Sequence, residues 1–196
     1  MQNGAASPLI LASASPRRAE LLRAAGIAFR VEASNLEEAR ESGETPRAYA
    51  ERLARDKARV VAQRFPGQPV LAADTIVVLR NGVDDAVLEK PADAADAARM
   101  LRHLSGRAHE VTTAVCLLAQ GEEQVRSETT RVLFRRIETE EILAYIATGE
   151  PMDKAGAYAI QGGAARWVDK IEGDYENVVG LPVALVRRML QAAELL

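Results

Sequence analysis

Residues 9–22, LILASASPRRAELL, form the stretch around which the rest of the fold can be built. The apolar start predicts a strand that enters a hydrophobic core. Ser15 and Pro16 predict the start of a helix, because serine is a preferred N-cap and proline suits the first helical position. Arg17 and Arg18 then fall in the first helical turn, where the positive end of the helix dipole disfavours cations.

Two interpretations of this turn remain open on the residues alone. In the first, free backbone N–H groups and the hydroxyls of Ser13 and Ser15 bind an anion. The guanidinium groups of Arg17 and Arg18 would match a phosphate there. In the second, the turn is an ordinary capped helix start with two solvated arginines.

The composition indicates one sizeable core in a soluble protein, with 196 residues of which 48% are hydrophobic and 27% charged. The net charge of -3 argues against a general nucleic-acid surface, so no nucleic-acid partner is expected. Cys116, in an apolar run, predicts a buried thiol rather than a disulfide or a nucleophile. With no signal peptide and no run long enough to span a bilayer, we expect a cytoplasmic protein without a membrane partner.

Apolar runs and helical periodicity alternate along the chain and predict a mixed α/β fold in a single domain, residues 1–196. Strands are expected at residues 9–12, 29–33, 70–79, 110–119, 124–137 and 178–181. Helices are expected to start at Pro16, Pro46, Asp93, Thr139 and Pro182. Asn81-Gly82 predicts a hairpin turn after the third strand.

Asp74 lies in the middle of the apolar run VLAADTIVVL, residues 70–79. Burying an unpaired carboxylate costs several kcal/mol, so this residue must be paired, hydrogen-bonded or bound to a metal. A structural salt bridge is one interpretation. A functional role is the other, favoured because neighbouring segments supply further charged residues.

The candidate site combines cations with carboxylates. The cations are Arg17, Arg18, Lys57 and Lys90, and the carboxylates are Asp74 and either Glu37 or Glu38. This combination suits a highly anionic substrate that arrives with a divalent cation, since Mg²⁺ prefers one or two carboxylates plus substrate phosphate oxygens. It indicates phosphate ester or anhydride chemistry. The sequence has neither a P-loop nor a G-x-G-x-x-G motif, and it shows no Ser/His/Asp or Cys/His set.

Six motifs occur in order over nearly the whole chain. They are residues 13–18 (SASPRR), Glu37-Glu38, Ala73-Asp74-Thr75, Glu89-Lys90-Pro91, Leu104-Ser105-Gly106 and residues 150–158 (EPMDKAGAY). Together they resemble the motifs of the Maf family of nucleoside triphosphate pyrophosphatases. The resemblance implies a mixed sheet with flanking helices, in two lobes around a cleft, similar to the inosine triphosphatases. It also implies a nucleotide substrate, a divalent metal (Mg²⁺ or Mn²⁺) and a possible homodimer.

The resemblance also assigns roles to individual residues. It implies phosphate or other substrate contacts for Ser13, Ser15, Arg17, Arg18, Thr75 and Gln161, catalytic roles for Asp74, Glu38, Lys57 and Lys90, and metal binding by Glu38 and Asp74. Residues 150–158 resemble the branch that acts on dTTP and UTP rather than the branch that acts on 7-methyl-GTP.

The resemblance leads to a mechanism in which water attacks the α-phosphorus in line, assisted by the metal, and pyrophosphate leaves. Asp74 would be the general base or a metal ligand, with Glu38 as the second ligand. The alternative is a non-catalytic phosphate- or RNA-binding regulator of cell division or septum formation. A content of only 4% aromatic residues disfavours recognition of single strands by stacking.

Overall fold

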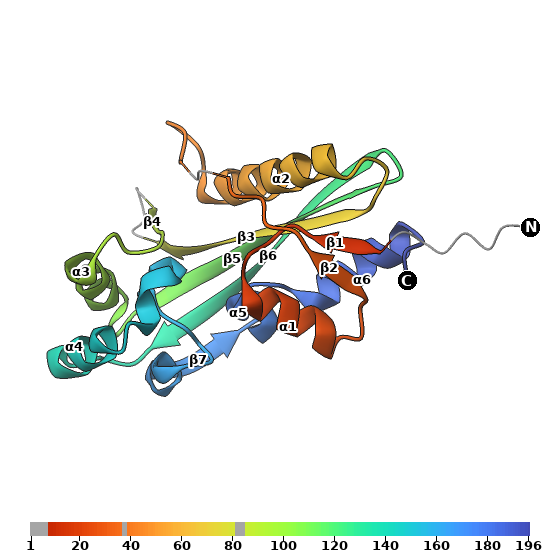
Figure 1. Ribbon diagram of the computed structural model, residues 1–196. Coiled ribbons are helices and arrows are strands. Elements are labelled where there is room, and N and C mark those ends of the chain that lie inside the picture. The colour runs from red at the N-terminus through yellow and green to blue at the C-terminus, as the bar shows by residue number, and fades with distance from the viewer. Residues whose placement is uncertain (1–7, 37–38, 81–84) are drawn as a thin grey trace, which may run out of the picture. The chain divides into compact units, whose positions relative to one another are not determined.

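The computed structural model describes residues 8–36, 39–80 and 85–196, which form a mixed α/β fold (Figure 1). The strands are β1 (Leu9–Leu11), β2 (Phe29–Val31), β3 (Val70–Leu79), β4 (Ala86–Leu88), β5 (Ala108–Ala119), β6 (Glu122–Phe134) and β7 (Val168–Glu172). The helices are α1 (Pro16–Ala24), α2 (Pro46–Arg64), α3 (Ala94–Leu104), α4 (Thr139–Ala147), α5 (Tyr175–Val179) and α6 (Val183–Ala192). Three 3₁₀ segments are η1 (Glu150–Asp153), η2 (Ala155–Ala157) and η3 (Gly163–Trp167).

The strands form one seven-stranded sheet in the order β2-β1-β3-β5-β6-β7, with β4 paired to β3. The predicted mixed sheet with flanking helices is thus confirmed. In the described part of the chain, no helix is both long enough and apolar enough to cross a bilayer. The Asn81-Gly82 turn lies outside the described residues, but the antiparallel pairing of β4 with β3 is the hairpin that it predicts.

Two compact units divide the chain. The first comprises Met1–Asp74, Thr113–Glu128 and Gly180–Leu196, and the second comprises Thr75–Thr112 and Thr129–Val179. Strands β3, β5 and β6 continue from one unit into the other. The single domain and the cleft between lobes stay predictions.

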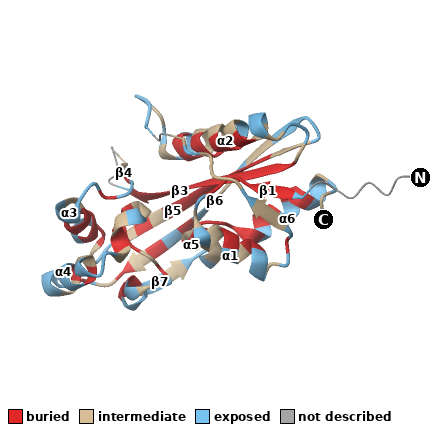
Figure 2. Ribbon diagram, in the orientation of Figure 1, coloured by how far each residue is buried: buried red, intermediate tan, exposed pale blue. Residues whose placement is uncertain are grey.

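The first unit is built from parallel β-α-β connections. β1 pairs in parallel with both β2 and β3, so that Ile10 lies opposite Arg30 on one side and Val70 on the other. α1 and α6 pack on one face of these strands and α2 lies on the opposite face (Figure 1). Buried residues follow β1, β3 and β5 (Figure 2). Cys116 of β5 is fully buried, as predicted, and burial raises the pKa of its thiol to about 12.

The second unit is held by antiparallel pairs and an aromatic cluster. β3 pairs with β4, and β6 pairs with β7. Phe134 packs edge-to-face on Tyr158, with ring centroids 4.8 Å apart, and Tyr145 packs in the same way on Trp167 at 5.0 Å. Such pairs add stability beyond the area that they bury. The cluster therefore fixes the segment after α4 on the end of the sheet.

The strand predicted at residues 178–181 is wrong, because Val178 and Val179 end α5, Gly180 lies in a turn and Leu181 is irregular. Asp174 Oδ1 accepts the backbone N–H groups of Glu176 (2.8 Å) and Asn177 (3.3 Å), as a helix cap does. The buried Asn177 amide then donates to the Val111 carbonyl at 2.9 Å. These tertiary hydrogen bonds outweigh the strand preference of the valines.

Gly156→Ala should destabilise the protein more than the matched Gly149→Ala. Both glycines have left-handed backbones, with φ of 68° and 76°. A Cβ at Gly156 would lie 2.9 Å from Val77 Cγ2, whereas one at Gly149 would have nothing within 4 Å. The difference between the variants isolates the clash, which should lower the free energy of unfolding by a further ~1–3 kcal/mol. Urea denaturation measures it, and equal losses in the two variants would contradict a rigid contact at Val77.

Candidate active site

The turn between β1 and α1 brings serine and arginine side chains together. Pro16 begins α1 as predicted, and its first turn contains no acidic residue. Arg18 Nη1 donates to Ser13 Oγ at 3.2 Å, and the Ser15 backbone N–H donates to the same oxygen at 3.2 Å. Ser15 occupies the N-cap position, but among the described residues its side chain makes no capping hydrogen bond. The Ser13 hydroxyl organises the turn instead.

Arg18 is held from a second side by the C-terminal part of the same unit. Its Nε donates to the Gly180 carbonyl at 2.8 Å, and the side chain is half-buried. The interpretation of Arg18 as a solvated arginine is therefore wrong. Two fixed contacts orient the guanidinium group at a helix N-terminus, where an anion would also meet the positive end of the helix dipole.

Lys57 and Asp74 form a buried ion pair between α2 and β3. Lys57 Nζ donates to Asp74 Oδ1 at 2.6 Å, and the two side chains are 9% and 7% exposed. Lys57 lies one helical turn from Leu53 and from Val61, both buried, so helical periodicity directs it at the sheet. Asp74 is thus paired and hydrogen-bonded, which meets the requirement of a buried carboxylate and agrees with the salt-bridge interpretation, whereas its functional role stays a prediction. The pair fixes Oδ1 and leaves Oδ2 outside it, which gives an oriented carboxylate.

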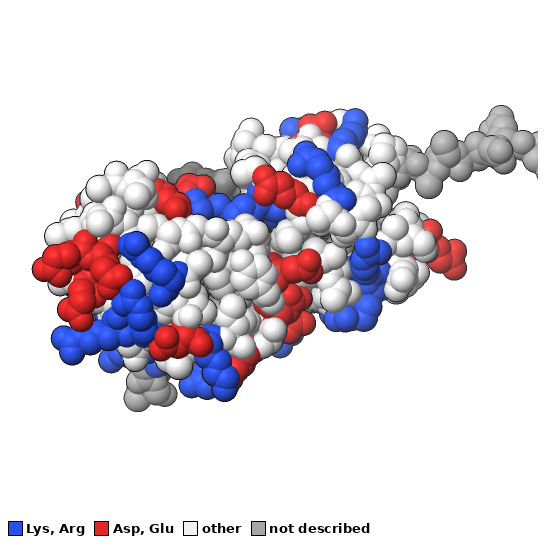
Figure 3. Space-filling model, turned by 90° about the horizontal axis from the view of Figure 1, so that it is seen from below, with Lys and Arg blue, Asp and Glu red and all other residues white. Residues whose placement is uncertain are grey.

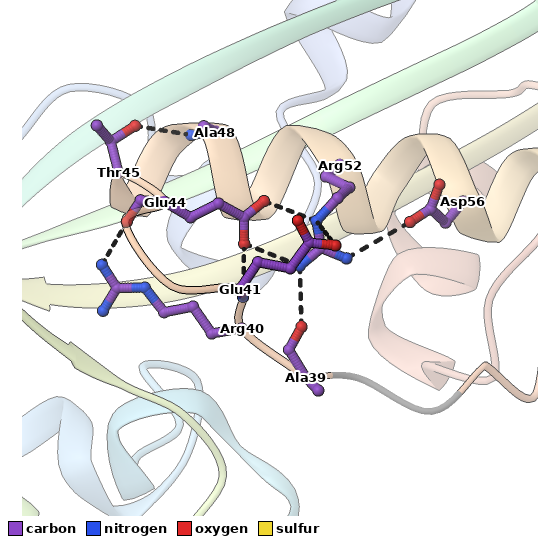
Figure 4. A network of polar contacts seen from close by, with 8 residues as sticks. All are labelled: Ala39, Arg40, Glu41, Glu44, Thr45, Ala48, Arg52 and Asp56. Carbon is purple, nitrogen blue, oxygen red and sulfur yellow. Dashed lines mark hydrogen bonds and ion pairs between the residues drawn. The ribbon is translucent and has the colours of Figure 1, made fainter.

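Glu37 and Glu38 lie outside the described residues, but the segment that follows them is anchored to α2 (Figure 4). Arg52 donates to the Ala39 carbonyl at 2.9 Å and to both carboxylate oxygens of Glu44, at 2.6 and 2.8 Å. The Arg52 hydrogen bonds lower the pKa of Glu44 to about 2. The Thr45 hydroxyl caps α2 by accepting the Ala48 N–H at 3.2 Å. Residues 39–45 are therefore tied to the first turns of α2.

The sequence analysis missed Arg52. Its contact with Glu44 joins a loop to a helix at a separation of eight residues, for which no helical spacing rule exists. One sign that Arg52 is held in place could be read from the sequence: Asp56 follows it at i+4, and the two side chains are 3.6 Å apart in the structure.

Arg17 is half-buried in the first turn of α1, in the first unit, and three further candidates belong to the second unit. Thr75 follows Asp74 on β3 and is half-buried, whereas Lys90 and Gln161 are exposed in loops. Within the units, the structure brings together Ser13 with Arg18 and Lys57 with Asp74. The places of Glu38, Lys90 and Gln161 in the site stay predictions.

A divalent metal fits the donor chemistry of the first unit. Asp74 is a hard oxygen donor with one oxygen outside its ion pair, which suits Mg²⁺ or Mn²⁺. In residues 8–36, 39–80 and 85–196 there is no group of three or more His, Cys, Asp or Glu that could hold a metal. Because Mg²⁺ needs only one or two carboxylates when substrate phosphates complete its shell, this donor set suits a metal that arrives with the substrate.

Comparison with solved structures shows which known fold the chain resembles. The Staphylococcus aureus Ham1 protein matches 94% of this chain and 98% of its own, with a TM-score of 0.53 and 14% identity. At that identity the likeness concerns the fold alone. A sequence model described as Maf-like protein matches residues 8–193, and the chain belongs to the Maf family.

Relatives with curated names cover almost the whole chain. The dTTP/UTP pyrophosphatase of Koribacter versatilis is 62% identical over 188 residues, which are 96% of this chain and 95% of the relative. The dTTP/UTP pyrophosphatase of Syntrophomonas wolfei is 53% identical over 182 residues, 92% of this chain and 94% of the relative.

Proposed function

We propose that the protein is a nucleoside triphosphate pyrophosphatase that hydrolyses dTTP and UTP to the nucleoside monophosphate and pyrophosphate. The names of the relatives at 62% and 53% identity support this activity. The structural observation that carries it is the oriented Asp74 carboxylate, in the same unit as the strand-turn-helix with its fixed Arg18. A base and an anion site are the two elements that phosphoric anhydride hydrolysis requires.

In the proposed reaction, Asp74 accepts a proton from the water that attacks the α-phosphorus. The bond from that phosphorus to the bridging oxygen breaks, and pyrophosphate leaves with the electron pair. Lys57 holds the carboxylate in one orientation by its 2.6 Å hydrogen bond. Asp74 and Glu38 would hold the divalent metal, Mg²⁺ or Mn²⁺, which when bound lowers the pKa of water and offsets phosphate charge.

The cationic residues stabilise the charge that develops on the leaving group. Arg17 and Arg18 follow the N-cap of α1, where backbone N–H groups and the helix dipole add to their attraction for phosphate. Ser13 and Ser15 supply hydroxyls at the same turn, and Thr75 adds one next to Asp74. Lys90 contributes a further positive charge. Preorganised charges of this kind supply most of what a protein can add to phosphoryl transfer.

Gln161 is proposed to recognise the base. Its amide carries both a donor and an acceptor, which match the adjacent N–H and C=O groups of uracil and thymine. A site that hydrogen-bonds one base edge penalises analogues that leave its polar groups unpaired.

dTTP and UTP should be hydrolysed with kcat/KM at least ~10-fold above that for ATP, GTP or 7-methyl-GTP. Pyrophosphate release is measured for each nucleotide with Mg²⁺ and with Mn²⁺, and EDTA should abolish it reversibly. A preference for a purine would contradict the role of Gln161. If none of the five nucleotides yields pyrophosphate, the proposed activity is overturned.

No described feature favours a non-catalytic RNA-binding regulator. Basic and acidic side chains are interspersed on the face seen in Figure 3, whereas nucleic-acid binding calls for a concentrated basic surface. A cytoplasmic location and a homodimer are also part of the proposal. Light scattering on the purified protein tests whether it is a homodimer.

A further inference from the structure

A chain of hydrogen bonds closes around the turn that carries Gln161. On one side of the turn, the Ala159 backbone N–H donates to Tyr145 Oη at 3.0 Å. On the other side, the Gly163 N–H donates to Glu150 Oε1 at 3.1 Å. Tyr145 Oη in turn donates to Glu150 Oε1 at 2.8 Å. The backbone is therefore fixed two residues before and two residues after Gln161, while the exposed Gln161 side chain takes no part in these bonds.

The tyrosine at the centre of this chain is held by burial and by aromatic packing. Tyr145 is 2% exposed and packs edge-to-face on Trp167. Trp167 Nε1 donates to Glu141 Oε1 at 3.3 Å, and Glu141 is paired with Arg135 at 2.7 Å. Burial raises the pKa of Tyr145 far above its usual value, so its hydroxyl keeps the proton that it donates to the Glu150 carboxylate.

The glycines beside Gln161 are explained by this carboxylate. A Cβ at Gly162 would lie 1.9 Å from Glu150 Oε1, although the φ of Gly162, -111°, is accessible to any residue. A Cβ at Gly163 would lie 3.1 Å from Tyr145 Cδ2. A side chain at Gly162 would therefore have to displace the Glu150 carboxylate, and one at Gly163 would crowd the Tyr145 ring, whereas the φ of Gly162 does not itself require glycine.

We propose that Tyr145 and Glu150 are positioning residues for base selectivity, and this rests on the proposed function in which Gln161 contacts the base. The Gln161 amide can turn over about its own terminal torsion angle, so a fixed backbone determines how far the amide reaches rather than which donor and acceptor order it reads. A pyrimidine ring extends less far from the ribose than a purine does. By fixing the backbone on both sides of Gln161, the pair sets this reach for a pyrimidine and disfavours a purine.

The test compares UTP with GTP, since the two share ribose and triphosphate and differ in the size of the base. Tyr145→Phe removes the hydroxyl and keeps the ring on Trp167. It should lower the ratio of kcat/KM for UTP to that for GTP by about tenfold, the effect of one well-placed hydrogen bond. Tyr158→Phe is the matched control: its hydroxyl bonds to His109 at 2.8 Å, so it should lose thermal stability and keep the wild-type ratio.

A second pair of variants covers the case in which Tyr145→Phe does not fold. Glu150→Ala removes the acceptor for Tyr145 and Gly163 and should lower the same ratio. Glu150→Gln retains an acceptor oxygen and should restore most of it. A purely structural role for Glu150 would lower the melting temperature and leave the ratio unchanged.

A double-mutant cycle shows whether the pair acts through Gln161. Gln161→Ala should lower the ratio by itself, and adding Tyr145→Phe should change it no further, because the positioned group is gone. Independent, multiplying effects would overturn the inference, as would a wild-type ratio in Tyr145→Phe. A wild-type protein that releases no pyrophosphate from UTP would overturn the proposed function and this inference with it.

Discussion

Asp74→Asn should lower kcat by about 10²- to 10⁴-fold, the range that a general base contributes. Asparagine has nearly the same shape, and its Oδ1 can still accept the hydrogen bond that Lys57 donates at 2.6 Å in the wild type. The amide cannot take a proton from water at neutral pH, and it brings no negative charge to a metal. The loss should therefore appear in kcat for UTP under saturating Mg²⁺.

Measurements of stability distinguish a loss of catalysis in Asp74→Asn from a loss of activity caused by unfolding. Removing one partner of a buried ion pair outright costs about 3–5 kcal/mol, so Asp74→Ala should lower the melting temperature more than Asp74→Asn does. The control is Glu123→Gln. This variant removes one negative charge that forms surface ion pairs with Arg55 and Arg59 of α2, the helix that also carries Lys57. That variant should keep kcat within about twofold, since surface pairs contribute little. Activity of Asp74→Asn within a few-fold of wild type would remove Asp74 from the mechanism.

The free energy of unfolding should decrease as the pH falls from about 6.5 to about 4 because of His109. The ring is 1% exposed, its Nε2 lies 2.8 Å from Tyr158 Oη, and burial lowers its pKa to about 4. In the unfolded chain the same group binds its proton near the ordinary value of 6.5. The unfolded state therefore holds more protons between these values, and stability is lost as the pH falls through this window. The full loss from this group is about 3 kcal/mol.

His109→Gln tests this assignment, since glutamine does not titrate. Its denaturation midpoint in urea should vary less between pH 6.5 and 4 than that of the wild type. His103→Gln is the control: His103 is exposed on α3, and its replacement should leave the profile unchanged. Parallel profiles for wild type and His109→Gln would show that other groups cause the acid sensitivity.

Local features of the fold could be predicted because single residues carry them. Thr45 and Pro46 start α2 as expected, and Asp93 caps α3 by accepting the Asp96 N–H at 2.8 Å. The helix α5 could not be predicted, because its cause is non-local: the Asn177 amide reaches the Val111 carbonyl, 66 residues away. Propensity describes a segment alone, and here tertiary hydrogen bonds decide its structure.

The same division holds for the candidate site. A carboxylate inside an apolar run requires a hydrogen-bonding or charged partner, so the need for a partner at Asp74 could be predicted from the sequence. Its pairing with Lys57 was not, since that depends on how α2 lies on β3. Gly162 and Gly163 follow Gln161, and a pair of glycines suits either the close approach of a backbone to a ligand or a tight turn, so the sequence alone does not distinguish the two. The structure adds a cause that no local pattern contains, the carboxylate of Glu150.

Cys116 gives this protein an intrinsic reporter of opening. It is the single cysteine of the chain, it is fully buried, and its pKa is raised to about 12. The thiolate is the nucleophile that reacts with thiol reagents, so at neutral pH these reagents should modify only molecules in which this part of β5 has become exposed to solvent. Under conditions where reclosing outpaces labelling, the reaction rate of the unmodified wild-type protein yields the free energy of that opening, with no probe to introduce.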